Sequence, residues 1–295
     1  MSAGLRFDGE VAIVTGAGGG LGQQYALDLA SRGAVVVVND LAADGDASVA
    51  STVAEITAAG GHAVGRAGDV ADPATADDLV ATALAEGGRL DVVINNAGAP
   101  PTGPFPETAA ADFDRIVDIS LGASVRLARA AWPQLADRGG RIVNVTSHSV
   151  FGIASSSPYI VAKAGTWGLT KALAYDGRDA GIKVNAVMPM AYTRMTAQIE
   201  DEDLLAFVKK HLPISKVSPL VIALAHRDVA QSGEIFHAGG GLVAPVGWGF
   251  GAGIVDHEPT PEHLLATMPG LAPGADITAF TDVNDSVAHI FSLIS

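Results

Sequence analysis

Continuously apolar runs rich in valine and isoleucine recur along the chain, each followed by an alanine-rich stretch with helical spacing. The runs lie at residues 11–16, 34–40, 62–69, 91–98, 141–147, 183–189 and 233–240. Because polar residues do not alternate within them, they are typical of parallel strands buried on both faces of a sheet. The helical stretches lie near residues 20–32, 46–59, 73–86, 107–137, 158–179 and 215–226.

This alternation predicts right-handed β–α–β units and the α/β class. We expect a single Rossmann-like, doubly wound domain over residues 7–243, with a seven-stranded parallel sheet. In such sheets ligands bind at the carboxyl ends of the strands. The residues that close the runs are therefore binding candidates: Gly16, Asp40, Asp69, Asn95, Asn96, Ser147 and Pro189.

Two segments depart from the pattern. Residues 190–212 form a polar, acidic insertion, which suits a lid over a substrate. Residues 244–295 are rich in proline and glycine and show helical spacing only at their end. We interpret them as a C-terminal extension with a short terminal helix.

Composition excludes several classes of function. The net charge of −14 argues against nucleic acid and anionic lipid as partners, because both require basic patches. The chain has no cysteine, so it has no disulfide scaffold, zinc–thiolate site or thiol nucleophile. No apolar run approaches the ~18 residues of a membrane span, and the first residues lack the apolar core of a signal peptide. We expect a cytoplasmic protein without a membrane partner.

The glycine-rich stretch "VAIVTGAGGGLG", residues 11–22, joins a strand to a helix. Backbone amides and the helix dipole at such a junction bind anions. Gly16 would permit the sharp turn, Gly20 the approach of a pyrophosphate, and Gly22 the packing of the helix on the strand, with Leu21 in the same segment. The pattern predicts a dinucleotide site.

Asp40 closes the second strand about 20 residues further on. A carboxylate there accepts hydrogen bonds from the adenosine ribose hydroxyls and repels a 2′-phosphate. No lysine or arginine lies within residues 15–31 or 39–46 to bind such a phosphate. The sequence therefore favours NAD over NADP as the cofactor.

Three further motifs indicate chemistry. "NNAG" at residues 95–98 closes the fourth strand, Ser147 closes the fifth, and "YIVAK" at residues 159–163 opens the next helix. Tyr159 and Lys163 lie four residues apart and so share one helical face. A nearby ammonium favours the phenolate and lowers the tyrosine pKa from its usual value of about 10.

Together these motifs resemble the short-chain dehydrogenase/reductase family across residues ~7–243. The resemblance implies that Tyr159 is the general acid/base, that Lys163 binds the nicotinamide ribose and lowers the tyrosine pKa, and that Ser147 holds the substrate oxygen. It implies hydride transfer between a secondary alcohol and NAD, and a homodimer or homotetramer formed through the helices near 107–137 and 158–179. Further cofactor-lining residues implied by it are Asp69, Val70, Asn96, Ala97, Gly98 and the loop from Pro189 to Thr193.

A narrower resemblance is to the (3R)-hydroxyacyl-CoA dehydrogenase units of peroxisomal multifunctional enzymes. The opening "RFDGEVAIVTGAGGGLGQQYALDLASRGAVVVVNDL", "RAAWPQL", the "RMT" of residues 194–196 and "GEIFHAGGGLVAPVGW" carry it. It implies a 3-hydroxyacyl-CoA substrate. A steroid, terpenoid or other carbonyl metabolite is the alternative, as is an NAD-binding sensor without turnover.

The sequence departs from the family pattern at three positions. Ser120 stands where the family usually has an asparagine that holds a proton-relay water, so we expect a modified relay. Ser147 lies twelve residues before Tyr159 where thirteen is usual, which leaves Ser149 as a possible substitute. Met190 replaces the glycine that usually follows Pro189.

Two patterns suggest other chemistry but lack support. His148 beside Ser147 suggests a serine nucleophile, but neighbouring strand residues point to opposite faces, and no nucleophile elbow accompanies it. The segment "HEPTPEH", residues 257–263, offers histidines and glutamates, but its prolines interrupt a helical ligand face. We expect no hydrolysis and no metal site.

Overall fold

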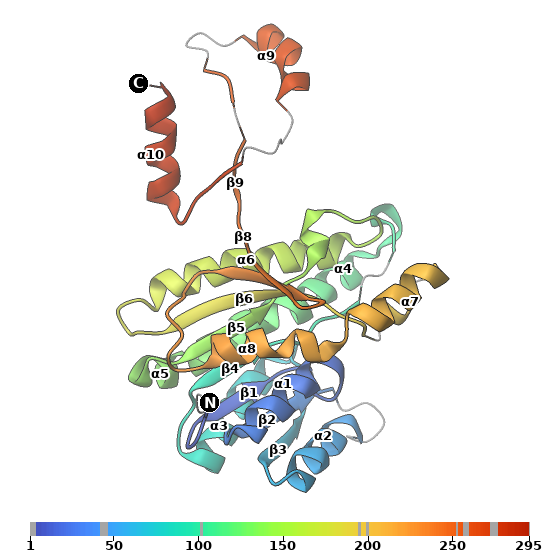
Figure 1. Ribbon diagram of the computed structural model, residues 1–295, viewed down its shortest axis with the longest axis vertical. Helices are drawn as coiled ribbons and strands as arrows, with labels where there is room; N and C mark the ends of the chain where they lie inside the picture. The colour runs from blue at the N-terminus through green and yellow to red at the C-terminus, as the bar shows by residue number, and fades with distance from the viewer. Residues whose placement is uncertain are drawn as a thin grey trace. The chain divides into compact units, whose positions relative to one another are not determined.

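The computed structural model describes residues 4–41, 47–100, 103–193, 196–198, 201–251, 253–255, 260–271 and 277–294. The predicted lid residues 194, 195, 199 and 200, and residues 257–259 of the histidine-containing segment, lie outside this set. The chain divides into two compact units, Met1–Pro245 and Val246–Ser295 (Figure 1).

The first unit is built on one sheet in the order β3-β2-β1-β4-β5-β6-β7-β8. Its strands are β1 (Val11–Val14), β2 (Val35–Asp40), β3 (His62–Ala67), β4 (Val92–Asn95), β5 (Arg141–Val145), β6 (Lys183–Met190), β7 (Ile235–Gly239) and β8 (Leu242–Val246). From β3 to β7 every pairing is parallel. The order reverses between β1 and β4, which is where doubly wound sheets bind ligands.

The sheet has eight strands, so the prediction of seven parallel strands is wrong by one. Gly240 and Gly241 both have positive φ, +62° and +95°, and form a two-residue turn after β7. A connection this short joins antiparallel strands only, so β8 makes the sheet mixed. Three of its five residues lie in the predicted C-terminal extension, which begins at residue 244.

Helices cover both faces of the sheet (Figure 1). They are α1 (Gly20–Ser31), α2 (Ala47–Ala58), α3 (Pro73–Gly87), α4 (Ala110–Val117), α5 (Ala123–Arg138), α6 (Ser157–Asp176), α7 (Glu202–His211) and α8 (Ser218–Ala225). One buried apolar cluster joins α1, α2 and α8 to one face of the strands. A second cluster joins α3, α5 and α6 to the other face, as the continuously apolar strands predict.

Local sequence signals set several helix ends. Asp72 caps α3 by accepting a hydrogen bond from the Ala74 amide at 2.9 Å, Pro73 takes the first helical position, and Gly88 ends the helix at φ +69°. The helix predicted over 107–137 is interrupted by a π-helical turn, Asp118–Gly122, between α4 and α5. No helix of the described chain is long and apolar enough to span a membrane.

The second unit contains a two-stranded antiparallel sheet, β9 (Gly249–Phe250) and β10 (Thr278–Ala279). The predicted terminal helix is present as α10 (Val283–Ile294). A further helix, α9 (Pro261–Thr267), was not expected. Pro261 was interpreted as a helix breaker, but at the first helical position its missing N–H is no loss.

A buried charge cluster joins strands at the amino edge of the sheet. Arg141 and Glu10, each 4% exposed, form a short ion pair between β5 and the residue that precedes β1. The Arg141 Nε also donates to the Ala225 carbonyl at 2.8 Å, and Arg227 Nε lies 3.0 Å from the second Glu10 oxygen. Removing Glu10 would leave a buried guanidinium without its counter-charge.

We predict that Glu10→Ala lowers the free energy of unfolding by about 3–5 kcal/mol, because breaking one side of a buried ion pair leaves an uncompensated charge. Urea denaturation measures this. Asp8→Ala, which breaks the exposed Arg6–Asp8 pair, is the matched control and should leave the midpoint unchanged. A loss below about 1 kcal/mol, the range of exposed pairs, would contradict the argument.

Candidate active site

The glycine loop after β1 packs closely against the end of β4. Gly16 has φ +64°, and a Cβ there would lie 2.9 Å from both the Ala97 Cα and the side-chain Nδ2 of Asn96. A Cβ on Gly22 would overlap the Gly16 carbonyl. Asn96 Nδ2 donates to the carbonyls of Thr15 and Gly16, each at 3.0 Å. Glycine is therefore required at 16 and 22 by backbone contact.

The start of α1 is open toward the cleft. Gly20 has φ +60°, and a Cβ there would meet no described atom within 4 Å. Leu21 turns the other way and packs against the apolar core. Amides at the first turn of a helix have no intrahelical partner, so this turn offers donors to an anion.

Asp40 closes β2 beside the same loop. Its Oδ2 accepts a hydrogen bond from the Gly18 amide at 2.9 Å, and its Oδ1 accepts one from the Leu41 amide at 2.7 Å. The carboxylate thus both organises the glycine loop and lines the cleft. Gly18, which had no expected role, is the residue that positions it.

Asp69 and Val70, after β3, are held by arginines from the next layer. Asp69 accepts from Arg115 Nη2 at 2.8 Å and from the Ala71 amide at 2.9 Å. The Arg115 guanidinium holds the pKa of the Asp69 carboxyl below its usual value, against the opposing effect of burial. The Val70 carbonyl accepts from Arg126 at 3.2 Å. These contacts fix the wall of the cleft beside Asp40.

A cleft of about 200 Å³ brings seven of the predicted cofactor residues together, without Gly20, Leu21, Gly22, Tyr159 and Lys163. Its lining includes Gly16, Asp40, Asp69, Val70, Asn96, Ala97 and Gly98. Pro189 and Thr193 are not part of this lining. Pro189 lies in β6, and the Thr193 amide donates to Thr196 Oγ1 at 2.7 Å in the loop that follows.

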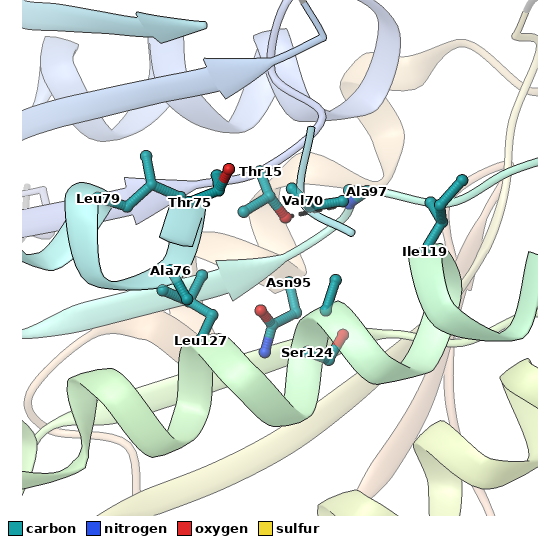
Figure 2. Close-up of a pocket in the computed structure, with 11 residues that line it drawn as sticks. Thr15, Val70, Thr75, Ala76, Leu79, Asn95, Ala97, Ile119, Ser124 and Leu127 are labelled. Atoms are coloured by element: carbon teal, nitrogen blue, oxygen red, sulfur yellow. Dashed lines mark hydrogen bonds between the residues drawn. The ribbon is translucent and has the colours of Figure 1, made fainter. Parts of the chain in front are cut away.

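A smaller cavity adjoins the cleft and shares Val70, Ala97 and Ile119 with its lining (Figure 2). Its volume is about 10 Å³, which is close to the space that one water needs. Asn95 at the end of β4 and Ser124 on α5 provide polar groups there (Figure 2). Asn95 is tied to the next strand by its Nδ2, which donates to Asn144 Oδ1 at 2.9 Å.

Ser147 and Tyr159 form the centre of the candidate active site. Ser147 follows β5 and caps a short 3-10 helix, His148–Phe151, by accepting from the Ser149 amide at 3.2 Å. Its side chain also hydrogen-bonds Tyr159. Burial raises the pKa of Tyr159, and the hydrogen bond to Ser147 opposes that rise. The phenol is therefore protonated near neutral pH in the unliganded protein.

Lys163 lies one turn after Tyr159 on α6 and is 3% exposed. Its Nζ donates to the Val145 carbonyl at 2.7 Å and lies 5.7 Å from the centre of the Tyr159 ring. Burial lowers the pKa of Lys163 to about 8. The shared helical face predicted for the two residues is therefore present, whereas the lowering of the tyrosine pKa by the lysine stays a prediction.

Ser120 lies in the π-helical turn and is 1% exposed. Its Oγ accepts a hydrogen bond from the Ala99 amide at 3.1 Å. A Cβ on Gly98 would lie 3.4 Å from Lys163 Nζ and 3.6 Å from Ser120 Oγ, so both groups meet at Gly98. The hydroxyl hydrogen of Ser120 can still donate, which suits the modified relay that the sequence suggests.

The geometry favours Ser147 over Ser149. The Ser149 Oγ is buried and makes no hydrogen bond in the described part of the chain, whereas Ser147 contacts Tyr159. Met190 extends β6 by one residue and pairs with Gly239 of β7. Its side chain is 41% exposed.

His148 does not serve Ser147. Its Nε2 lies 2.9 Å from Nδ1 of His237 on β7, and the ring centres are 4.9 Å apart. Burial and the neighbouring His237 lower the pKa of His148. This pair links the loop after β5 to β7. The sequence contains no signal for it, because the two residues are 89 positions apart.

A sequence model of the family described as short chain dehydrogenase matches residues 10–204. The chain belongs to the short-chain dehydrogenase/reductase family. It is therefore an oxidoreductase acting on CH–OH groups of small molecules, as the arrangement of Ser147, Tyr159 and Lys163 suggests.

Two relatives illustrate the range of the family. The chain is 39% identical over 294 residues to the peroxisomal hydratase-dehydrogenase-epimerase of Neurospora crassa, covering 97% of this chain and 31% of that protein. It is 40% identical over 256 residues to the peroxisomal multifunctional enzyme type 2 of Mus musculus, covering 84% and 34%. This family member thus spans about a third of these larger proteins.

A solved structure agrees with the fold. The crystal structure of a short chain dehydrogenase from Mycobacterium avium matches with a TM-score of 0.78 and 35% identity, covering 92% of this chain and 98% of that one. The full-length peroxisomal multifunctional enzyme type 2 of Drosophila melanogaster matches with a TM-score of 0.79 and 27% identity, covering 98% and 50%.

We predict that Lys163→Met changes how stability depends on pH. The pKa of Lys163 is about 8 in the folded protein and 10.5 when unperturbed. Between these pH values the unfolded chain binds the extra proton, so the wild-type free energy of unfolding rises with pH. The rise from this group is about 3 kcal/mol between pH ~8 and ~10.5.

Urea denaturation of both proteins at several pH values measures this difference. The variant should lose the rise attributed to Lys163, so that the wild-type free energy of unfolding increases relative to that of the variant by about 3 kcal/mol across this window. Parallel curves across this window would show that Lys163 is not a buried lysine with a lowered pKa.

Proposed function

We propose that this chain is an NAD(H)-dependent dehydrogenase that interconverts a secondary alcohol and its ketone on a 3-hydroxyacyl-CoA type of substrate. The observation that carries this is the hydrogen bond between Ser147 and Tyr159 beside the buried Lys163, at the same strand edge as the glycine cleft. An NAD-binding sensor would need the cleft but not this triad.

Each residue of the triad has a distinct task in the proposal. Tyr159 exchanges a proton with the substrate oxygen, and Ser147 donates a hydrogen bond that orients that oxygen. Lys163 supplies positive charge one helical turn away and a donor for the nicotinamide ribose. Burial raises the pKa of Tyr159, which favours the phenol as the proton donor toward a ketone.

The cleft fits a dinucleotide. A Cβ on Gly16 or Gly22 would lie too close to neighbouring protein atoms, so the loop is tightly packed at these two positions. Gly20 instead faces open space, as the approach of a pyrophosphate to the first turn of α1 requires. Asp40 would hold the adenosine ribose, while Asp69, Val70, Asn96, Ala97 and Gly98 would line the remainder. The bound cofactor supplies the hydride acceptor or donor.

The name of one relative supports the thioester. A relative that is 33% identical over 240 residues is the (2S)-[(R)-hydroxy(phenyl)methyl]succinyl-CoA dehydrogenase subunit BbsD of Thauera aromatica. That protein's name describes a secondary alcohol on a CoA thioester. A steroid, terpenoid or other simple alcohol is the alternative that the substrate test below separates.

An apolar groove between α5 and α6 supports the proposed homodimer or homotetramer. It is lined mainly by Val125, Ala128, Trp132, Pro133, Leu169 and Leu173. The cytoplasmic location stays a prediction.

We predict that Tyr159→Phe lowers kcat by about 10²–10⁴-fold, because it removes the proton donor while keeping the ring. NADH formation on hydroxyacyl-CoAs and on simple secondary alcohols measures the rate. NADH binding, followed by fluorescence, should persist in the variant. Wild-type protein that binds NAD but oxidises no alcohol would contradict the dehydrogenase.

We predict that Asp40→Asn lowers the preference for NAD over NADP about tenfold, which corresponds to the loss of one close charge repulsion near the protein surface. Asparagine keeps an oxygen for the Gly18 amide but places an NH2 group next to the Leu41 amide, so the substitution removes the charge together with one of the two acceptors. The measurement is kcat/KM with each cofactor, with Asp72→Asn at the cap of α3 as the control. An unchanged ratio would remove the role assigned to Asp40.

A further inference from the structure

Most arginines of this acidic protein are neutralised locally. The sequence has 18 lysines and arginines against 32 aspartates and glutamates. Eight arginines of the described chain lie within ion-pair distance of a carboxylate: Arg6, Arg66, Arg89, Arg115, Arg126, Arg138, Arg141 and Arg227. These side chains add little attraction for an anionic ligand.

The last turn of α7 gathers several basic side chains that lie outside these ion pairs. It carries Lys209, Lys210 and His211, which we call the α7 basic end, and all three are exposed. None of them forms an ion pair with a carboxylate of the described residues. Glu202 and Asp203 lie in the first turn of the helix, about 10 Å away along its axis. The helix therefore does not neutralise its own basic end.

The α7 basic end lies at the carboxyl edge of the sheet, beside the candidate active site. The Tyr192 amide, two residues after β6, donates to the Leu212 carbonyl at 2.7 Å. Lys209 Nζ lies 5.5 Å from the centre of the Tyr192 ring. A Cβ on Gly240, just after β7, would lie 3.6 Å from the His211 carbonyl oxygen. The end of α7 is thus anchored to the segments that follow two central strands.

Apolar surface precedes the charges on the same helix. Leu204 and Phe207 are 48% and 55% exposed. The Phe207 ring stacks on His211 with centres 4.6 Å apart. Along α7 the exposed surface therefore passes from apolar to aromatic to cationic. A ligand with an apolar chain at one end and phosphates at the other matches this order.

We propose that the α7 basic end binds the phosphate groups of the nucleotide part of a coenzyme A thioester substrate. The inference rests on the proposed function for its substrate class. Lysine ammonium groups bind phosphate as point charges, and local cations offset the repulsion between a polyanionic substrate and a protein of net charge −14. The helix dipole also favours cations at this end, but that role predicts no dependence on the substrate.

The experiment compares a 3-hydroxyacyl-CoA with the N-acetylcysteamine thioester of the same acid, which keeps the reacting carbon and lacks the phosphates. The test variant is Lys209→Gln/Lys210→Gln. The control is Lys183→Gln/Arg178→Gln, which removes the same charge at the start of β6 and just after α6, at the opposite edge of the sheet. Steady-state kcat and KM are measured at low and high salt.

We expect the test variant to raise KM for the CoA thioester about tenfold at low salt, the effect of losing two exposed charge pairs. Its kcat and its KM for the truncated thioester should stay at wild-type values, and the difference should shrink in high salt. Inhibition by adenosine 3′,5′-bisphosphate, which competes with the CoA thioester in the wild type, should weaken in the same proportion.

Two results overturn the inference. One is a test variant with unchanged KM for the CoA thioester, and the other is an equal rise in KM for both thioesters, which indicates a structural role of α7. Failure of the proposed substrate class has a different signature, since wild-type protein would then oxidise simple secondary alcohols and neither thioester. The inference would fall with it.

Discussion

The side-chain amide of Asn96 sets the spacing on which the site depends. By donating both hydrogens to the carbonyls of Thr15 and Gly16, it fixes the loop after β1 against the end of β4. These two strands are neighbours at the point where the strand order reverses. A side chain at Gly16 or Gly22 would collide with this amide or with the carbonyl it binds. The glycines are therefore required by the asparagine as much as by a ligand.

The residues at the end of β5 position the groups that would react, because they hold α6 in place. Three consecutive positions there hold α6: the Val145 carbonyl accepts from Lys163 Nζ, Thr146 Oγ1 donates to the Lys163 carbonyl at 2.8 Å, and Ser147 bonds Tyr159. A buried ammonium is costly unless it is hydrogen-bonded. The strand whose carbonyl accepts the Lys163 hydrogen bond is also the strand that Ser147 follows. The same contact between β5 and α6 therefore compensates the buried ammonium and aligns Ser147 with Tyr159.

The sequence predicted the features that depend on local patterns. Apolar runs gave seven strands, the four-residue spacing of Tyr159 and Lys163 gave a shared helical face, and glycine density gave the turn at Gly16. Features that depend on distant partners were not predictable. The contact of His148 with His237 crosses 89 positions, and β8 exists because it pairs with β7.

Some local signals were present but misjudged. The paired glycines 240 and 241 indicate a hairpin turn, and Pro261 after Thr260 indicates a helix start, since Thr260 caps α9 through the His263 amide at 3.2 Å. Both lie beyond the regular alternation of strands and helices. The end of the alternation predicted a C-terminal extension with only a short terminal helix there, and it outweighed the turn and capping residues.

The placement of charge divides the site into two kinds of anion recognition. Around the glycine loop the donors are backbone amides and a helix terminus, which attract an anion without net charge and lose little strength in salt because they act at close range. At the end of α7 the donors are exposed ammonium groups, whose attraction extends over about 8 Å at physiological ionic strength and weakens as salt rises. The pyrophosphate of a dinucleotide, which would contact the glycine loop directly, suits the first kind. The phosphates of a coenzyme A thioester, which would be drawn in from solvent, suit the second, because exposed charges speed association while each adds only modestly to affinity.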